Sequence, residues 1–151
     1  MHEKTYTEEI GAAIARQKDQ PGALLPLLHD IQDRLGHVPD EALPVIAKAL
    51  NLSRADVHGV VTFYHHFRSA KPGKHVLRVC RAEACQAMGA NELFSYIEKS
   101  LRVKAGETTQ DGRFTLEAVY CLGNCACSPA VMIDDDLHGR VTPQRFDELV
   151  K

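Results

Sequence analysis

Four cysteines, spaced as two pairs, constrain what this chain can fold into more than any other feature. The pairs are Cys80 with Cys85 and Cys121 with Cys125, and 35 residues lie between them. A fifth cysteine, Cys127, follows two positions later. Four thiolates are the ligand number of an iron–sulfur cluster and also of a structural zinc ion, so the number leaves both open. We therefore expect the fold to bring two distant segments to one metal centre.

The spacing within the pairs favours a cluster over zinc. Zinc ribbons usually place paired cysteines two to four residues apart in tight turns, whereas C-x4-C is a wider loop that also opens the plant-type ferredoxin pattern. Plant-type ferredoxins need a further cysteine where this chain has Met88, so that family is excluded. A thiol oxidoreductase would have to use C-x4-C, which lacks the tight helix start that lowers a thiol pKa. A zinc-stabilised binding module and a thiol enzyme stay open as alternatives.

Length and composition are those of an ordinary globular protein. The chain has 151 residues, 44% hydrophobic and 25% charged, and a chain of this length buries roughly 68–70% of its unfolded surface. No apolar run approaches the ~20 residues of a membrane span, so no direct membrane contact is expected. A net charge of −2 without a basic cluster gives no footprint for nucleic-acid binding. The start lacks a secretory signal and the cysteine number is odd, so we expect reduced cysteines in the cytoplasm.

The first half of the chain shows helical periodicity. We expect a short first helix over residues 5–19, a well-buried second helix that ends at Gly36, and a third that ends near Leu50. Ser53 stands three residues before Asp56, a capping-box spacing that predicts the start of a fourth helix. These elements describe a small helical bundle.

A domain boundary is expected at residues 71–74. This Lys-Pro-Gly-Lys stretch has linker composition, and the periodicity changes after it from helical to alternating. We therefore predict a helical bundle domain at residues 1–72 and a second domain at residues 73–151.

The second domain alternates between strand and helix patterns. The expected elements are strands at 75–80, 114–120, 130–133 and 137–141, and helices at about 86–101 and from 142 onward. The two longer strands each deliver the first cysteine of a pair at their end. This order suits a small α/β sandwich whose loops meet at one edge, where functional residues usually lie.

The chain has no other signal for chemistry of its own. Its glycines form neither a dinucleotide-binding nor a P-loop motif, so we expect no bound nucleotide. No nucleophile with a nearby base stands out, and four thiolates leave no open metal position for a substrate. Within the first cysteine loop, the charges of Arg81 and Glu83 could tune a cluster or face solvent, and we expect them to face solvent. The chain is therefore predicted to be an electron carrier rather than a catalyst.

The whole cysteine pattern resembles that of the thioredoxin-like [2Fe–2S] ferredoxins. The resemblance rests on C-x4-C, the 35-residue gap, C-x3-C and the following Pro129. Residues 24–39 and 57–67 are similar to the helical half of the small iron–sulfur subunits of NAD-linked dehydrogenase complexes. Within that group, residues 80–89 and 121–129 look most like the gamma subunits of cytoplasmic NAD-dependent formate dehydrogenases, because complex I counterparts more often lack a cysteine at position 127.

The resemblance implies an α+β chain, a helical bundle followed by a thioredoxin-like α/β domain that carries one [2Fe–2S] cluster. The ligands it implies are Cys80, Cys85, Cys121 and Cys125, which leaves Cys127 as a neutral thiol nearby. The implied partners are an FMN- and NAD-binding flavoprotein subunit and a molybdenum-containing formate-oxidising subunit. The alternative parents are NADH:quinone oxidoreductase and NAD-reducing hydrogenase.

Overall fold

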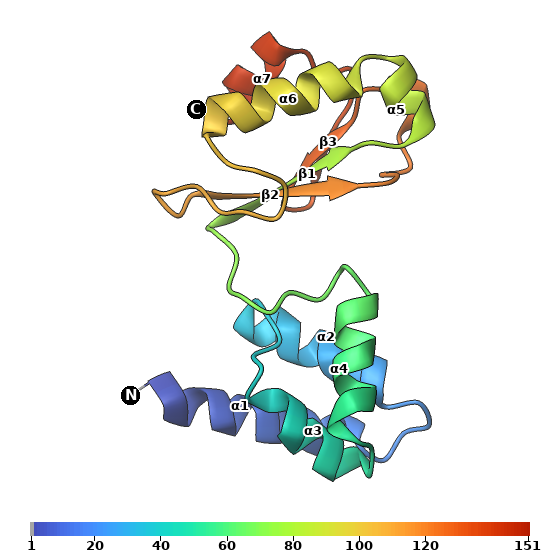
Figure 1. Cartoon of the computed structure of the whole chain (residues 1–151), viewed down its shortest axis with the longest axis vertical. Helices are drawn as coiled ribbons and strands as arrows, with labels where there is room; N and C mark the ends of the chain where they lie inside the picture. Colours follow the sequence, from blue (N-terminus) through green and yellow to red (C-terminus); the bar gives the residue numbers. More distant parts are fainter. Residues whose placement is uncertain (1) are drawn as a thin grey trace. The chain divides into compact units, whose positions relative to one another are not determined.

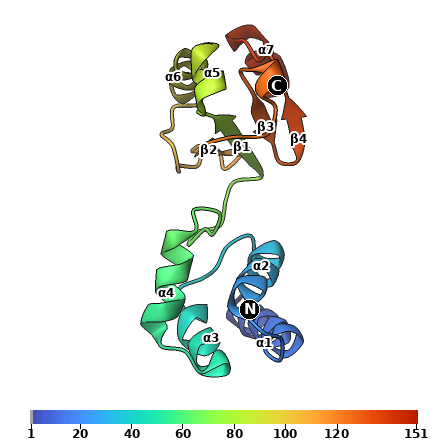
Figure 2. The same cartoon turned by 90° about the vertical axis from the view of Figure 1, so that its right-hand side faces the viewer.

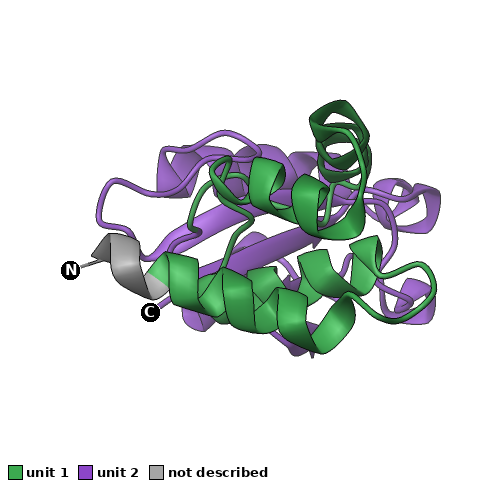
Figure 3. Ribbon diagram, turned by 90° about the horizontal axis from the view of Figure 1, so that it is seen from below, with its two compact units in different colours: residues 1–71 green, residues 72–151 purple. Residues whose placement is uncertain are grey.

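The computed structural model describes the backbone of residues 2–151 and the side chains from residue 6 onward. The chain forms two compact units, residues 1–71 and residues 72–151, coloured green and purple in Figure 3. Each unit has a hydrophobic core of its own. The order of helices before an α/β unit confirms the predicted α+β class (Figure 1).

The first unit consists of helices. They are α1 (His2–Gln17), α2 (Leu24–Leu35), α3 (Ala42–Leu50) and α4 (Arg54–Phe63). The prediction that the first helix is short is wrong, because α1 has 16 residues. Its interior Gly11 costs about 1 kcal/mol of helix propensity, but burial of Ile10 and Ala13 offsets that cost.

Local sequence signals determine where these helices start and stop. Gly36 adopts a left-handed conformation with φ 82° and ends α2 as predicted. The predicted capping box is confirmed at α4, where Asp56 N donates to Ser53 Oγ at 3.0 Å and Ser53 N donates back to Asp56 Oδ2 at 3.0 Å. The core between the helices is built on Leu27, Leu28 and other fully buried aliphatic side chains.

The second unit is a four-stranded sheet covered on one face by helices. The strands are β1 (His75–Cys80), β2 (Phe114–Val119), β3 (Val131–Ile133) and β4 (Asp136–His138). Their order is β2-β1-β3-β4, with β1 and β2 parallel and the other pairs antiparallel. Figures 1 and 2 show α6 (Ala90–Leu101) and α7 (Pro143–Leu149) side by side over one face of this sheet.

Two predicted elements of this unit differ in the structure. The helix expected at 86–101 is two helices, α5 (Glu83–Ala87) and α6, because Gly89 adopts a left-handed conformation between them. The strand expected at 137–141 is short, since β4 ends at His138 and Arg140 turns the chain away with φ 51°. Among the described residues, no helix combines the length and apolar character that crossing a membrane requires.

Candidate metal centre

The sheet brings the two cysteine pairs to one edge. Cys80 is the last residue of β1 and lies opposite Val119, the last residue of the parallel strand β2. Cys121 follows Val119 by two positions. Because the carboxyl ends of parallel strands meet at the same edge, the loops that follow β1 and β2 are neighbours. The prediction that the two longer strands deliver the first cysteine of each pair at their ends is confirmed.

The first pair is buried beneath this edge. Cys80 is 2% exposed and Cys85 is 1% exposed, and both pack with Ala90 and Ala130. Cys85 lies within α5, so the spacer between the two cysteines contains a helical turn instead of the open loop expected from C-x4-C. Burial of two thiols in a small apolar cluster keeps water away from their sulfurs.

The second pair lies at the surface. Cys121 and Cys125 are both exposed, and their Sγ atoms are 4.0 Å apart. Two thiolates on one tetrahedral metal, each at about 2.3 Å, lie about 3.8 Å apart, so this pair has the spacing for one shared metal atom. Gly123 forms the turn between them with φ 74°, and its N–H donates to Cys121 Sγ at 3.3 Å.

Contacts between the two loops join the pairs. Against the effect of burial, the backbone of Ala82 and of Leu122 in the second loop acts to lower the pKa of Cys80, and the backbone of Ala130 acts to lower the pKa of Cys85. Cys80 N in turn donates to Ala130 O at 3.0 Å. In the part of the chain that the structure describes, no three His, Cys, Asp or Glu side chains are grouped so that they could hold one metal ion. The sulfurs thus stand as two adjacent pairs, each from one loop.

Burial and neighbouring groups shift the thiol pKa values in opposite directions. Burial raises the pKa of Cys80 above its ordinary value, and the adjacent Cys85 adds to this rise. Burial also tends to raise the pKa of Cys85, but hydrogen bonds from Ser128, Cys80 and Ala130 outweigh it and lower that pKa. At the surface, the Cys121 sulfur raises the pKa of Cys125.

Ser128 lies between the two pairs, and sequence reasoning missed it. Its Oγ is 3.3 Å from Cys85 Sγ and donates to Cys125 O at 2.8 Å. Its residue is only 7% exposed. A hydroxyl residue directly after the Cys-Ala-Cys stretch was the available signal, but only the fold shows that it reaches the first pair.

Cys127 packs against Gly139. A Cβ atom added at Gly139 would lie 2.7 Å from Cys127 Cβ and 2.8 Å from Asn124 Nδ2. Arg140 N donates to Cys127 O at 2.7 Å, and Val141 N donates to Pro129 O at 3.0 Å. Residues 139–141 therefore pack against the second cysteine loop and hydrogen-bond to it, a role that no local pattern in the sequence indicated.

Arg81 faces solvent only in part, because its residue is half-buried. Its guanidinium lies 4.8 Å from the centroid of the Phe94 ring and donates to Asn91 Oδ1 at 3.2 Å. Its Nε is buried and has no hydrogen-bond partner among the described residues. Glu83 is exposed, as expected. Arg81 thus anchors the start of the first loop on α6.

The donor set fits an iron–sulfur cluster. It consists of thiols alone, arranged as two pairs on adjoining loops, and the Gly123 N–H donates to the Cys121 sulfur. A two-iron cluster takes two protein thiolates on each iron, and hydrogen bonds to sulfur are a recognised part of such sites. These residues would hold the group as one buried pair and one exposed pair.

Comparison with known proteins gives consistent relatives over nearly the whole chain. The NADH-quinone oxidoreductase subunit designated E in Pseudomonas aeruginosa is 42% identical over 148 residues, which cover 98% of this chain and 89% of that protein. Its counterpart of the same designation in Escherichia coli K12 is 39% identical over 144 residues, covering 95% and 87% of the two chains.

Solved structures show the same fold in a larger protein. A crystal structure of an NAD⁺-reducing [NiFe]-hydrogenase matches 89% of this chain with a TM-score of 0.71 at 24% sequence identity. The match spans 22% of that hydrogenase chain.

A known protein family matches nearly the same region of the chain. The thioredoxin-like [2Fe–2S] ferredoxin family matches residues 10–151, which include both cysteine pairs and most of the helical unit. The predicted cofactor, one [2Fe–2S] cluster, is confirmed by this family. The chain belongs to the thioredoxin-like [2Fe–2S] ferredoxins.

Proposed function

We propose that the chain is the small electron-transfer subunit of an NADH-quinone oxidoreductase-type complex. Its cluster is held by the two cysteine pairs, Cys80 with Cys85 and Cys121 with Cys125. The observation that carries the proposal is the meeting of both pairs at one sheet edge, in a chain that aligns almost end to end with NADH-quinone oxidoreductase subunits.

The two cysteine pairs contribute to the centre in different ways. A [2Fe–2S] cluster, when bound, exchanges one electron at a time. The buried pair and its apolar neighbours exclude water from one side. The exposed pair, Cys121 and Cys125, leaves the other side accessible to a redox partner. The Gly123 N–H stabilises negative charge on the Cys121 sulfur, and the backbone of Leu122 and of Ala130 acts in the same direction on Cys80 and Cys85.

The partner that we expect for this chain is a flavoprotein. NAD exchanges two electrons as a hydride, whereas a single [2Fe–2S] cluster exchanges one, so a flavin must convert between them. This chain has no phosphate-binding glycine loop. We therefore place the FMN- and NAD-binding site on a partner subunit.

The parent complex that we prefer differs from the one expected from the sequence. Cys127 favoured a formate dehydrogenase with a molybdenum-containing subunit, but the relatives above belong to NADH-quinone oxidoreductases. We therefore prefer the NADH-quinone oxidoreductase interpretation. Formate dehydrogenase stays a second candidate because of Cys127, and the hydrogenase supports the fold alone at 24% identity.

Purification of the tagged chain from its native cells tests the parent complex. The complex is expected to oxidise NADH with a quinone acceptor and to contain a flavin. Formate oxidation with molybdenum in the preparation would instead establish the second candidate. Hydrogen uptake would indicate a hydrogenase parent, and a colourless, zinc-loaded chain would overturn all of these interpretations.

Two matched serine variants test the ligand assignment. Cys125→Ser is expected to lose or severely destabilise the cluster, because it removes one sulfur of the exposed pair. Cys127→Ser is expected to keep about two irons and two sulfides per chain, because Cys127 packs against Gly139. Iron content and the electron paramagnetic resonance (EPR) spectrum of the reduced protein are the measurements. If Cys127→Ser loses iron while Cys125→Ser keeps an unchanged spectrum, Cys127 is the ligand.

A further inference from the structure

Ser128 is a buried hydroxyl placed between residues of both cysteine pairs. Its Oγ is 3.3 Å from Cys85 Sγ and 2.8 Å from Cys125 O. Backbone hydrogen bonds hold the residues on both sides of this position, since Arg140 N donates to Cys127 O and Val141 N donates to Pro129 O. The backbone that carries the hydroxyl is therefore held in place, and the hydroxyl hydrogen can rotate toward either neighbour.

Metal binding changes which group can donate in this contact. While Cys85 is a thiol, its S–H can donate to Ser128 Oγ, and the Ser128 hydrogen goes to Cys125 O. A cysteine that binds iron has lost its proton, so Ser128 holds the only hydrogen left between Oγ and the Cys85 sulfur. Hydrogen bonds to an ionised acceptor are roughly twice as strong as those between neutral groups. The hydrogen is thus drawn from the carbonyl toward the sulfur.

We propose that the Ser128 hydroxyl donates a hydrogen bond to the Cys85 sulfur in the cluster-loaded protein and thereby raises the reduction potential. Reduction adds negative charge at the sulfurs, and a donor at this position stabilises the reduced form more than the oxidised form. Ser128 and Cys85 are 7% and 1% exposed, so water competes little for the sulfur. The inference rests on Cys85 being a ligand, as the proposed function has it.

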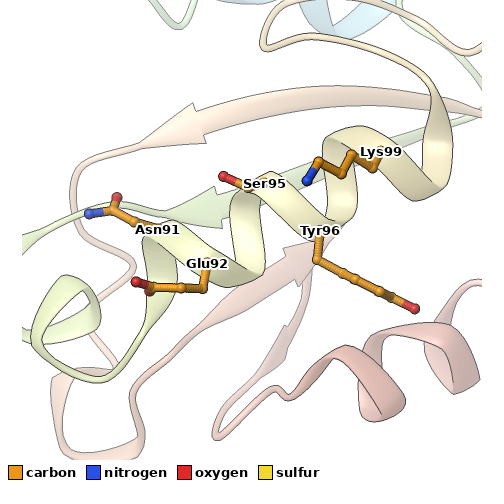
Figure 4. Close-up of a pocket in the computed structure, with 5 residues that line it drawn as sticks. All are labelled: Asn91, Glu92, Ser95, Tyr96 and Lys99. Carbon is orange, nitrogen blue, oxygen red and sulfur yellow. The ribbon is translucent and has the colours of Figure 1, made fainter.

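The test compares reduction potentials of serine variants in the intact chain. Ser128→Ala is expected to bind two irons and to have a lower midpoint potential than the wild type. Ser128→Thr keeps the hydroxyl, so its midpoint potential is expected to lie closer to that of the wild type than the potential of Ser128→Ala does. Ser95→Ala is the matched control, because Ser95 lies on the outward face of α6 (Figure 4) and is exposed. Its potential is expected to equal that of the wild type.

A spectroscopic measurement separates a hydrogen bond from a purely structural role. Pulsed EPR of the reduced protein in H2O and D2O reports exchangeable protons close to the cluster. The wild type and Ser128→Thr are expected to show one coupling from an exchangeable proton, that of the hydroxyl. This coupling is expected to be missing from Ser128→Ala. Ser128→Gly removes the same hydroxyl and takes the place of Ser128→Ala if the alanine variant binds no iron.

The outcomes distinguish this inference from the proposed function. An unchanged midpoint potential and an unchanged set of couplings, in a hydroxyl-free variant with full iron, would overturn the role of Ser128 alone. A Cys85→Ala variant that keeps two irons and the wild-type spectrum would overturn the ligand assignment itself.

Discussion

At the scale of single residues, Gly139 shows how a position outside the cysteine motifs determines the path of a cysteine loop. Three atoms of residues 124 and 127 lie within 2.8 Å of the place where its Cβ would be. Real Cβ atoms do not approach other atoms so closely, so any side chain forces the loop to move. The loop that moves is the one that carries Cys125.

Gly139→Ala is therefore expected to alter the metal centre without removing a ligand. Forcing the loop outward costs about 1–3 kcal/mol, as other overpacked positions do, and shifts the EPR spectrum of the reduced protein. Denaturant unfolding and EPR are the measurements. Gly59→Ala is the matched control, because nothing lies within 4 Å of its Cβ position in α4. The control is expected to stabilise the chain by about 0.5–1 kcal/mol, and an unchanged spectrum for Gly139→Ala would contradict the expectation.

At the scale of elements, an ion-pair network joins α1 to α2. Arg16 of α1 lies 2.9 Å from Asp30 of α2, and Arg34 lies 2.9 Å from the other oxygen of Asp30 and 3.2 Å from Glu9. Partial burial tends to raise the pKa of Asp30, but the hydrogen bonds and charges of Arg34 and Arg16 outweigh it and lower that pKa. The carboxylate is therefore held in its charged form by both helices.

The stability of this helix pair is expected to depend on pH through Asp30. A carboxyl whose pKa is lowered by folding contributes stability above its unfolded value, about 3.9, and loses that contribution as pH falls through the lower folded value. Asp30→Asn is expected to cost roughly 1 kcal/mol at pH 7 and much less at pH 3. Hydrogen exchange of α1 and α2 at the two pH values is the measurement. The exposed Asp33→Asn is the control, and a cost that stays equal at both pH values would argue against the network.

At the scale of the whole molecule, the two units bury separate cores. Side chains of α1 to α4 supply most of one core, and those of β1, β2, β3, α6 and α7 supply most of the other. All five cysteines lie in the second unit. The energy of metal binding is therefore coupled to the folding of the second unit.

Removal of iron by a chelator is expected to affect the two units differently. Hydrogen exchange should become faster at α5 and at the ends of β1 and β2, because the thiolates there lose the metal that ties the loops together. Exchange in α1 to α4 should stay unchanged. An equal rise in exchange in the helical unit would show that the two units unfold as one.

The sequence alone determined the features that depend on neighbouring residues. The stop of α2 at Gly36, the capping box of Ser53 with Asp56, and the strand endings before the cysteines all follow from local chemistry. The cysteine spacing likewise predicted a cluster site, because pairs of thiols a few residues apart are arranged by their own loops. The end of β4 and the break at Gly89 were missed, since alternation and helical spacing continue through both.

Only the tertiary structure decided which side chains from distant segments meet at the centre. Ser128 reaches Cys85 across 43 residues, and the half-buried Arg81 lies on the Phe94 ring. Gly139 is an ordinary turn residue in the sequence, and its importance appears only when Cys127 packs against it. The physical reason is the same in each case. Periodicity and spacing describe neighbours along the chain, whereas hydrogen bonds and steric contacts of the centre depend on which strands pair and which loops the sheet brings to one edge.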